Sequence, residues 1–265
     1  MTVRGHIERL GGAAIDGARA AADLYATLAA TLRGALRPRA GGRRPPGEVV
    51  HQMYEIGNRS LLFIAVTLGF IGMVMIYQSC LQLSRITGDL SRVGSEFAKI
   101  ATHDFGPTLT AMMVATRVGA GIAAEVGSMK VTEQIDALRM CGVSPIDYLI
   151  VPRALASVIM TFVLSVIGGA ILYAAGGVTA HLSFGVNYRT FFDAGQIEAI
   201  DVAIGTSKCL TYGLAIPVVS GYCGLRARGS SEGVGWATTA AVIGSSLAVI
   251  ILDFLLSGVG LTLRR

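Results

Sequence analysis

Charged side chains are scarce in this sequence. Only 15% of its 265 residues are Asp, Glu, Lys or Arg, whereas 52% are hydrophobic; soluble domains carry about a quarter charged residues. The charges gather in residues 1–59 and 125–153, and several long runs elsewhere have almost none. A hydrocarbon core of about 30 Å needs about 20 apolar residues per helix, and several runs reach that length. The composition excludes an ordinary soluble domain and predicts an all-α integral membrane protein.

Catalytic and cofactor motifs are also missing. The sequence contains no G-x-x-x-x-G-K-[ST] motif, so it has no P-loop to hold nucleotide phosphates. It has no H-E-x-x-H motif and no Ser/His/Asp set, and its four histidines lie far apart. The four cysteines are scattered without a C-x-x-C pair, which argues against a disulfide or zinc framework. We therefore expect a non-enzymatic chain without its own cofactor or metal; if ATP with Mg²⁺ drives this protein, another chain must bind it.

About five apolar runs are candidate membrane spans. They cover roughly residues 60–84, 105–124, 154–177, 202–225 and 236–256, with a charged loop expected between the first two. The net charge of +5 does not indicate a nucleic-acid partner, because the basic residues lie beside these runs, where membrane topology explains them. The excess of Lys and Arg places the N-terminus and residues 125–153 in the cytoplasm and the C-terminus outside.

The N-terminal region is expected to form an amphipathic helix over residues 7–36. Apolar residues recur there at three- and four-residue steps: Ile7, Leu10, Ala14, Ala18, Ala21, Tyr25, Leu28 and Leu32. Such a helix fits the headgroup layer of a membrane, and the alternative is a soluble helix that packs on a partner. A basic Pro/Gly linker follows, so we divide the chain into an interfacial region, 1–48, and a transmembrane domain, 49–265.

The charged segment between the second and third spans is expected to hold a short helix. Thr132 is a candidate N-cap with Glu133 in the first turn, and Gly142 is placed to end the helix after about ten residues. Ile135 and Leu138 share its apolar face. Spacing alone leaves two interpretations open: a helix that inserts into a partner's groove, or a solvated helix that covers the bundle.

Residues 117–153 (RVGAGIAAEVGSMKVTEQIDALRMCGVSPIDYLIVPR) resemble the signature of the MlaE (YrbE) permease family. The similarity extends to FIGMV at 70–74, FGPTLTA at 105–111, ATT at 237–239 and SSLAVIILDF at 245–254. The similarity covers roughly residues 50–258. The first 45 residues resemble the family only in their general character and not residue by residue.

This resemblance implies the permease subunit of an ATP-driven lipid transporter in a bacterial inner membrane, with phospholipid as substrate. The expected partners are a second copy of the chain, two cytoplasmic ABC ATPase subunits, a periplasmic ring of MCE-domain proteins and, in some members, a STAS-domain protein. The helix matching Glu133–Cys141 is the family's coupling helix. The expected ATPase-coupling residues are Glu125, Lys130, Glu133, Gln134, Asp136, Leu138 and Arg139.

Ionisable residues inside the spans are functional candidates, because a buried charge is costly unless it is paired. Lys208 and Asp253 are expected at similar depth and could form an ion pair, with His103 and Asp104 nearby. The family commonly has Arg-Glu at the last two positions, so the chain departs from its pattern there. Arg117 is expected to reach cytoplasmic headgroups. The candidate lipid-binding residues are Leu68, Phe70, Ile71, Val74, Met75, Tyr77, His103, Asp104, Leu109, Met113, Lys208 and Asp253.

Several functions stay open at this stage. Lys208 and the acids would either line a lipid cavity between protomers or form a purely structural ion pair. The same type of assembly would also suit another hydrophobic substrate, such as a sterol or a fatty acid. An ion-coupled secondary transporter would need charges near the bilayer midplane and matching broken helices, which this sequence does not suggest. A membrane scaffold that only anchors other subunits is a further alternative.

Overall fold

The computed structural model describes residues 3–36, 47–86, 88–193 and 198–263, and for residues 3–14, 16 and 263 it describes the backbone alone. All regular elements within these ranges are helices. Five helical stretches are long and apolar enough to cross a membrane: Glu48–Ile86, Val93–Val131, Ile146–Phe184, Ala199–Leu225 and Ser231–Thr262. The predicted all-α membrane protein with five spans is confirmed.

The second span is a continuous helical stretch of changing pitch. It consists of α3 (Val93–Ile100), the π-helical η1 (Ala101–Phe105), α4 (Gly106–Val114), the π-helical η2 (Ala115–Gly119) and α5 (Ala120–Val131). Pro107 has no N–H to bond the carbonyl of His103, and the N–H of Gly106 bonds the carbonyl of Ala101, five residues back. The predicted charged loop before this span was too long, because the helix begins at Val93 rather than near Phe105.

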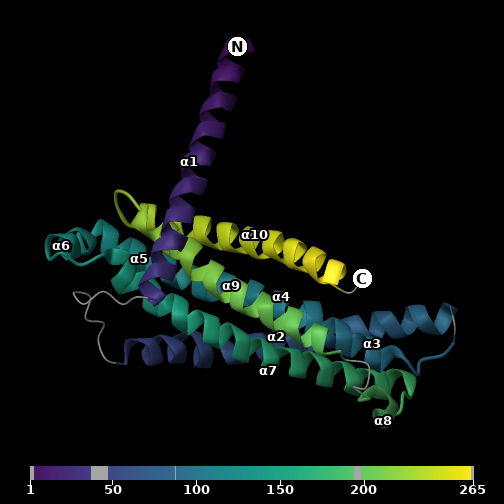
Figure 1. The fold of residues 1–265 in the computed structure, drawn as a ribbon. Helices are drawn as coiled ribbons and strands as arrows, with labels where there is room; N and C mark the ends of the chain where they lie inside the picture. The colour runs from purple at the N-terminus through teal and green to yellow at the C-terminus, as the bar shows by residue number, and fades with distance from the viewer. Residues whose placement is uncertain (1–2, 37–46, 87, 194–197, 264–265) are drawn as a thin grey trace.

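The other spans agree more closely with the expected runs. They are α2 (Glu48–Ile86), η3 (Ile146–Ile150) continuing into α7 (Val151–Phe184), α9 (Ala199–Leu225) and α10 (Ser231–Leu263). A four-residue helix, α8 (Tyr188–Phe191), lies between α7 and α9 and was not predicted. The helix α6 (Gln134–Met140) protrudes at one end of the bundle, and α8 lies at the opposite end (Figure 1).

The spans pack as a bundle in which α7 contacts α2 and α9, while α5 contacts α9 and α10 (Figure 1). Glycines allow the closest approaches. Gly72 of α2 lies against the backbone of Leu172 in α7, and Gly205 of α9 lies against the backbone of Thr102 in η1. A Cβ atom at either glycine would collide with that backbone, so the missing side chains set the helix spacing.

The helix α10 lies at the margin of the bundle and is poorly covered. Only 11% of its most apolar window is buried within the chain. Ile243, Leu247 and Phe254 are 63%, 54% and 79% exposed. A helix of this kind faces either lipid or another protein chain.

The N-terminal helix α1 (Val3–Leu36) crosses the bundle near its α6 end, and its first half stands away from it (Figure 1). It contacts α7, α9 and η3 through the face that holds the buried Thr27, Thr31 and Gly34. The predicted apolar stripe lies elsewhere on the helix, since Tyr25 is 73% and Leu32 41% exposed. This stripe is open to a membrane surface or a partner, and the interfacial role stays a prediction; the side chains of its first members, Ile7, Leu10 and Ala14, lie outside the described residues.

Candidate functional site

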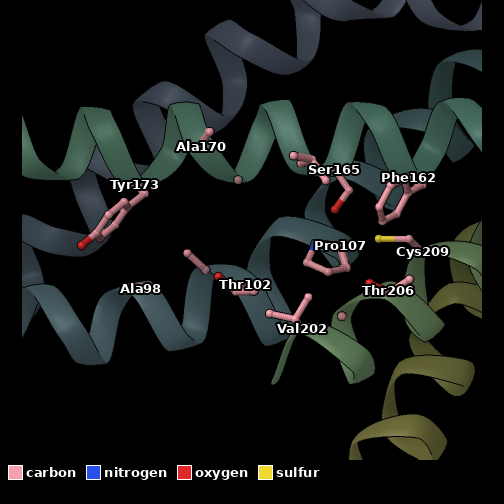
Figure 2. A pocket seen from close by; sticks show the side chains of 14 residues that line it. Ala98, Thr102, Pro107, Phe162, Ser165, Ala170, Tyr173, Val202, Thr206 and Cys209 are labelled. Carbon is pink, nitrogen blue, oxygen red and sulfur yellow. The ribbon is translucent and has the colours of Figure 1, made fainter. Parts of the chain in front are cut away.

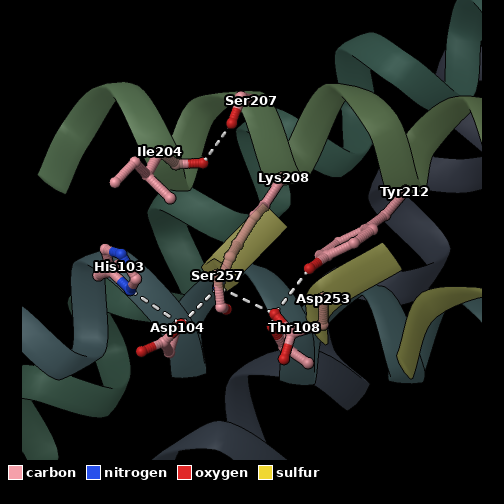
Figure 3. A network of polar contacts seen from close by, with 9 residues as sticks. All are labelled: His103, Asp104, Thr108, Ile204, Ser207, Lys208, Tyr212, Asp253 and Ser257. Carbon is pink, nitrogen blue, oxygen red and sulfur yellow. Dashed lines mark hydrogen bonds and ion pairs between the residues drawn. The ribbon is translucent and has the colours of Figure 1, made fainter. Parts of the chain in front are cut away.

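Lys208 lies at the centre of a charged cluster between the second, fourth and fifth spans (Figure 3). Its side chain is completely buried, and its ammonium group forms an ion pair with Asp104. The Nζ atom also lies 2.9 Å from Asp253 Oδ1 and donates to Ser257 Oγ at 2.8 Å. The predicted Lys208–Asp253 ion pair is confirmed, and Asp104 joins it.

Further hydrogen bonds hold the two carboxylates in place (Figure 3). Asp253 Oδ1 accepts from Tyr212 Oη at 2.8 Å and from Thr108 Oγ1 at 3.0 Å. His103 Nδ1 lies 2.8 Å from Asp104 Oδ1. The ammonium group of Lys208 thus donates to two protein oxygens and is ion-paired with a third, so its charge is compensated within the chain.

The acids, rather than the lysine, form the accessible side of this cluster. The side chains of Asp104 and Asp253 are 43% and 29% exposed, whereas that of Lys208 is 0% exposed. A ligand that approaches from outside the chain would therefore meet carboxylate oxygens first. This geometry favours the structural ion pair, and direct contact between Lys208 and a lipid phosphate stays a prediction.

The segment that contains α6 differs in detail from the expected coupling helix. The helix has seven residues, Gln134–Met140, and Thr132 belongs to the end of α5 rather than capping α6. Glu133 occupies the cap position in the left-handed region, with φ of 62° and no side-chain cap. The sequence signal was misleading because the chain reverses sharply between α5 and α6, which leaves Thr132 bonded back to the carbonyl of Ser128.

The end of α6 is as predicted. Gly142 has a φ of 73°, and its N–H bonds the carbonyl of Arg139 while that of Val143 bonds the carbonyl of Leu138. These two bonds form a Schellman motif, which needs a residue in the left-handed region after the helix. The helix therefore stops where the glycine permits the turn.

Apolar and ionic contacts fix α6 to the bundle. Ile135 is fully buried and Leu138 is partly buried against the core, so this face anchors the helix instead of inserting into a partner. Asp136 accepts from Lys130 of α5 at 2.8 Å and from Arg139 at 3.3 Å. The hydrogen bond from Lys130 holds the pKa of Asp136 below its ordinary value.

The outward surface of α6 contains Gln134, Ala137, Arg139 and Met140. Met140 is 85% exposed and was not among the predicted coupling residues. Met140 follows Ala137 by three residues, and residues at this spacing lie on the same face of a helix, so the sequence could have grouped the two together. Glu125, a predicted coupling residue, accepts from the buried Arg153 at 2.6 Å and so connects α5 to α7; its coupling role stays a prediction.

The predicted apolar wall of α2 divides into two faces. Leu68 is fully buried in the core, so in this structure it faces no lipid. Phe70, Val74 and Tyr77 follow one another at helical spacing and are 65%, 61% and 45% exposed. The other predicted wall residues, Ile71, Met75, Leu109 and Met113, are partly buried against the core.

An apolar pocket that the sequence did not reveal lies between the second span, α7 and α9 (Figure 2). Its volume is about 360 Å³, within the range of small-molecule sites. Pro107, Phe162, Tyr173 and Val202 contribute much of its wall, and small residues such as Ala170 leave the space open. Only the polar atoms of a few residues, including Ser165 and Thr206, interrupt this lining, so the pocket suits an apolar ligand.

Comparisons with known proteins agree with this architecture. The sequence profile of the family described as Permease MlaE matches residues 49–259. A probable ABC transporter permease protein of Synechocystis is 35% identical over 82% of this chain and 82% of its own length. The intermembrane phospholipid transport system permease protein MlaE of Haemophilus influenzae is 34% identical over 80% of this chain and 82% of its own.

A plant protein is also similar. TRIGALACTOSYLDIACYLGLYCEROL 1, chloroplastic, from Arabidopsis thaliana is 31% identical over 78% of this chain and 60% of its own length. The profile match includes the second, third and fourth spans and α6 completely, and all but the outermost residues of the first and fifth spans. The chain therefore belongs to the MlaE permease family, the membrane-spanning permease subunits of ABC-type transporters.

Proposed function

We propose that this chain moves phospholipid through a bacterial inner membrane, driven by ATP hydrolysis on separate ATPase subunits. The observation that carries the substrate is the similarity to the Haemophilus influenzae permease, which is named for intermembrane phospholipid transport and matched over 82% of its length. The apolar pocket of about 360 Å³ and the exposed stripe of Phe70, Val74 and Tyr77 are surfaces that acyl chains would contact.

The proposed ATPase contact is the outward surface of α6. A coupling element must be accessible to the partner and must also be firmly attached to the spans it moves. Met140 and Arg139 are exposed, while Ile135 is fully buried against the bundle. Asp136 and Lys130 join α6 to α5, and Glu125 and Arg153 join α5 to α7. A displacement of α6 would therefore act on both helices.

The remaining partners follow from the same proposal. The exposed face of α10 would contact a second copy of the chain, and two ATPase subunits would bind this dimer. MCE-domain proteins would receive or supply lipid on the periplasmic side, and a STAS-domain protein would accompany the ATPase in some assemblies. The Lys and Arg excess supports an orientation with α1 and α6 in the cytoplasm and the C-terminus in the periplasm.

Purification of the full chain with its associated proteins tests this proposal. We expect mass spectrometry to identify an ABC ATPase in the complex and phospholipid in the extracted lipids. Recovery of the permease without an ATPase would contradict the proposed energy source. Enrichment of a sterol, a fatty acid or a glycolipid instead would retain the assembly but replace the substrate.

The variant Met140→Glu tests the docking surface. It places a charge on an exposed apolar side chain of α6, so we expect less ATPase to co-purify while the permease stays folded. Ile86→Glu is the matched control, because Ile86 is 80% exposed, close to the 85% of Met140, but lies at the end of α2 away from α6. Equal ATPase recovery with both variants would contradict docking at α6.

A further inference from the structure

A polar pocket of about 480 Å³ lies between α2, α5 and the beginning of α7, near the α6 end of the bundle. Three arginines contribute to its wall: Arg59 of α2, Arg117 of η2 and Arg153 of α7. Glu55 and Glu125 are the acids of the same wall. The pocket is therefore built from charged groups, unlike the apolar pocket described above.

The charges of this pocket do not balance. Arg59 forms an ion pair with Glu55 at 2.6 Å, and Arg153 forms one with Glu125 at 2.6 Å. Arg117 donates to the hydroxyl of Ser60 at 2.5 Å, and no carboxylate among the described residues lies within ion-pairing distance of it. Three cations thus face two anions, and the cation without a counter-charge sits within a membrane span, where an unpaired charge is costly.

Arg153 provides a second, independent indication of a ligand. The residue is only 4% exposed, and its Nη1 and Nη2 atoms donate to the Leu149 carbonyl and to Glu125. Its Nε–H has no acceptor among the described residues, although the side chain lines the pocket. Buried donors in native proteins are almost always hydrogen-bonded, so an oxygen-bearing ligand is expected beside it.

The depth of the pocket identifies the chemistry of that ligand. Arg59 immediately precedes the uncharged run 60–84, and Arg153 immediately precedes the uncharged run 154–180. Both arginines therefore lie where apolar chain begins, at the level of lipid headgroups. The anion that a membrane offers at this level is phosphate, and the planar guanidinium group binds phosphate oxygens in a bidentate geometry.

We propose that this pocket binds a phosphate group, supplied by a phospholipid headgroup of the leaflet at the α6 end or by free phosphate. Arg117 would neutralise the negative charge of the phosphate group. Arg59 and the Nε–H of Arg153 would donate further hydrogen bonds to its oxygens. The site is separate from the Lys208 cluster, whose ammonium group is already satisfied by protein oxygens. The proposal goes beyond the transport function. It holds equally if the bound lipid is a permanent structural lipid and not the transported substrate.

Native mass spectrometry of the delipidated full chain in detergent tests the proposal. The probes are phosphatidylglycerol, a diacylglycerol with the same acyl chains but no phosphate, and inorganic phosphate as competitor. We expect phosphatidylglycerol to bind more tightly than diacylglycerol, and Arg117→Gln to weaken its binding about tenfold, the effect of one lost charged hydrogen bond. Arg85→Gln, at an exposed position near the other end of α2, is the matched control and should bind as the wild type does.

The competitor distinguishes the two sources of phosphate. Displacement of phosphatidylglycerol by millimolar inorganic phosphate would support a site for free phosphate, and its failure to compete would support a headgroup site. If Arg117→Gln does not fold, Arg59→Gln replaces it, because this side chain is 61% exposed, and a threefold loss is expected. Equal binding of phosphatidylglycerol and diacylglycerol, or binding by the folded arginine variants equal to that of Arg85→Gln, would overturn the proposal. The proposal would also be overturned if folded Lys208→Gln lost phosphatidylglycerol binding while the arginine variants kept it.

Discussion

Replacement of Lys208 by methionine separates a structural role of the charged cluster from a lipid-binding role. Methionine retains most of the apolar stem but removes the ammonium group that bonds Asp104, Asp253 and Ser257. Because Lys208 is completely buried, the variant leaves the two carboxylates near each other without the cation between them. We therefore expect Lys208→Met to destabilise the protein.

The expected loss is about 3 kcal/mol. Removal of one partner from a buried ion pair costs about 3–5 kcal/mol. The lower end applies here, because Asp104 and Asp253 are 43% and 29% exposed and can recover some hydration. Asp253 also keeps the hydrogen bonds from Tyr212 and Thr108. With a shift of about 2–4 °C per kcal/mol for a chain of similar size, the melting temperature should fall by about 6–12 °C.

Thermal unfolding of the full chain in detergent, followed by size-exclusion chromatography, measures this loss. Lys99→Met is the matched control, since Lys99 is a half-buried lysine of α3 and its loss should change the stability by less than about 0.5 kcal/mol. The double variant Lys208→Met with Asp253→Asn should be more stable than the sum of the single effects predicts, because the unpaired carboxylate is then also removed.

A normal melting temperature for Lys208→Met would refute this reasoning. If that variant also lost lipid transport in reconstituted vesicles, the lysine would act on the substrate rather than on the fold. Transport reduced in proportion to the amount of folded protein would instead support the structural ion pair.

Three further predictions concern α6 and the apolar pocket. Glu133→Gly should raise the stability by about 1 kcal/mol in thermal unfolding, because glycine adopts the observed φ of 62° without strain, and a loss of stability would contradict this. The hydrogen bond from Lys130 lowers the pKa of Asp136, so its stabilisation is present above the ordinary Asp pKa of about 3.9 and is lost as pH falls through the lower folded-state value. The stability difference between wild type and Asp136→Asn should disappear in that acidic range, and its persistence well below it would contradict the pairing. Ala170→Trp should fill the apolar pocket and reduce co-purified lipid several-fold, whereas Ala174→Trp, one turn further and outside the pocket, should not; equal lipid content would show that the pocket is not a lipid site.

The positions of the spans along the chain were predictable because the length of an apolar run is a local property of the sequence. Runs such as 202–225 contain enough apolar residues to cross a membrane, and α9 ends at Leu225 as expected. The start of the second span was not predictable in this way. Glu96 and Lys99 suggested a loop, but in the structure they lie on a helix whose other face buries Phe97 and Ala98.

The candidate site was predictable in its members but not in its arrangement. A lysine and an acid at similar depth on neighbouring spans indicated an ion pair, and Lys208 and Asp253 form it. Which of them faces outward depends on helix rotation, which hydropathy does not determine. The same limit explains Leu68, which hydropathy does not distinguish from the exposed Phe70, and Met140, whose exposure depends on how Ile135 anchors α6.

The sequence by itself determined that this protein is helical, that it crosses the membrane about five times and that its charged segment between the second and third spans is a separate element. These properties follow from the number and spacing of apolar residues along the chain. Tertiary structure alone decided that, among the residues the structure describes, Arg117 is bonded to a hydroxyl group and to no carboxylate, while Glu125 is paired with Arg153. The reason is physical: the fate of a charge within a membrane depends on which groups of other helices lie within a few ångströms, and those groups are far away in the sequence.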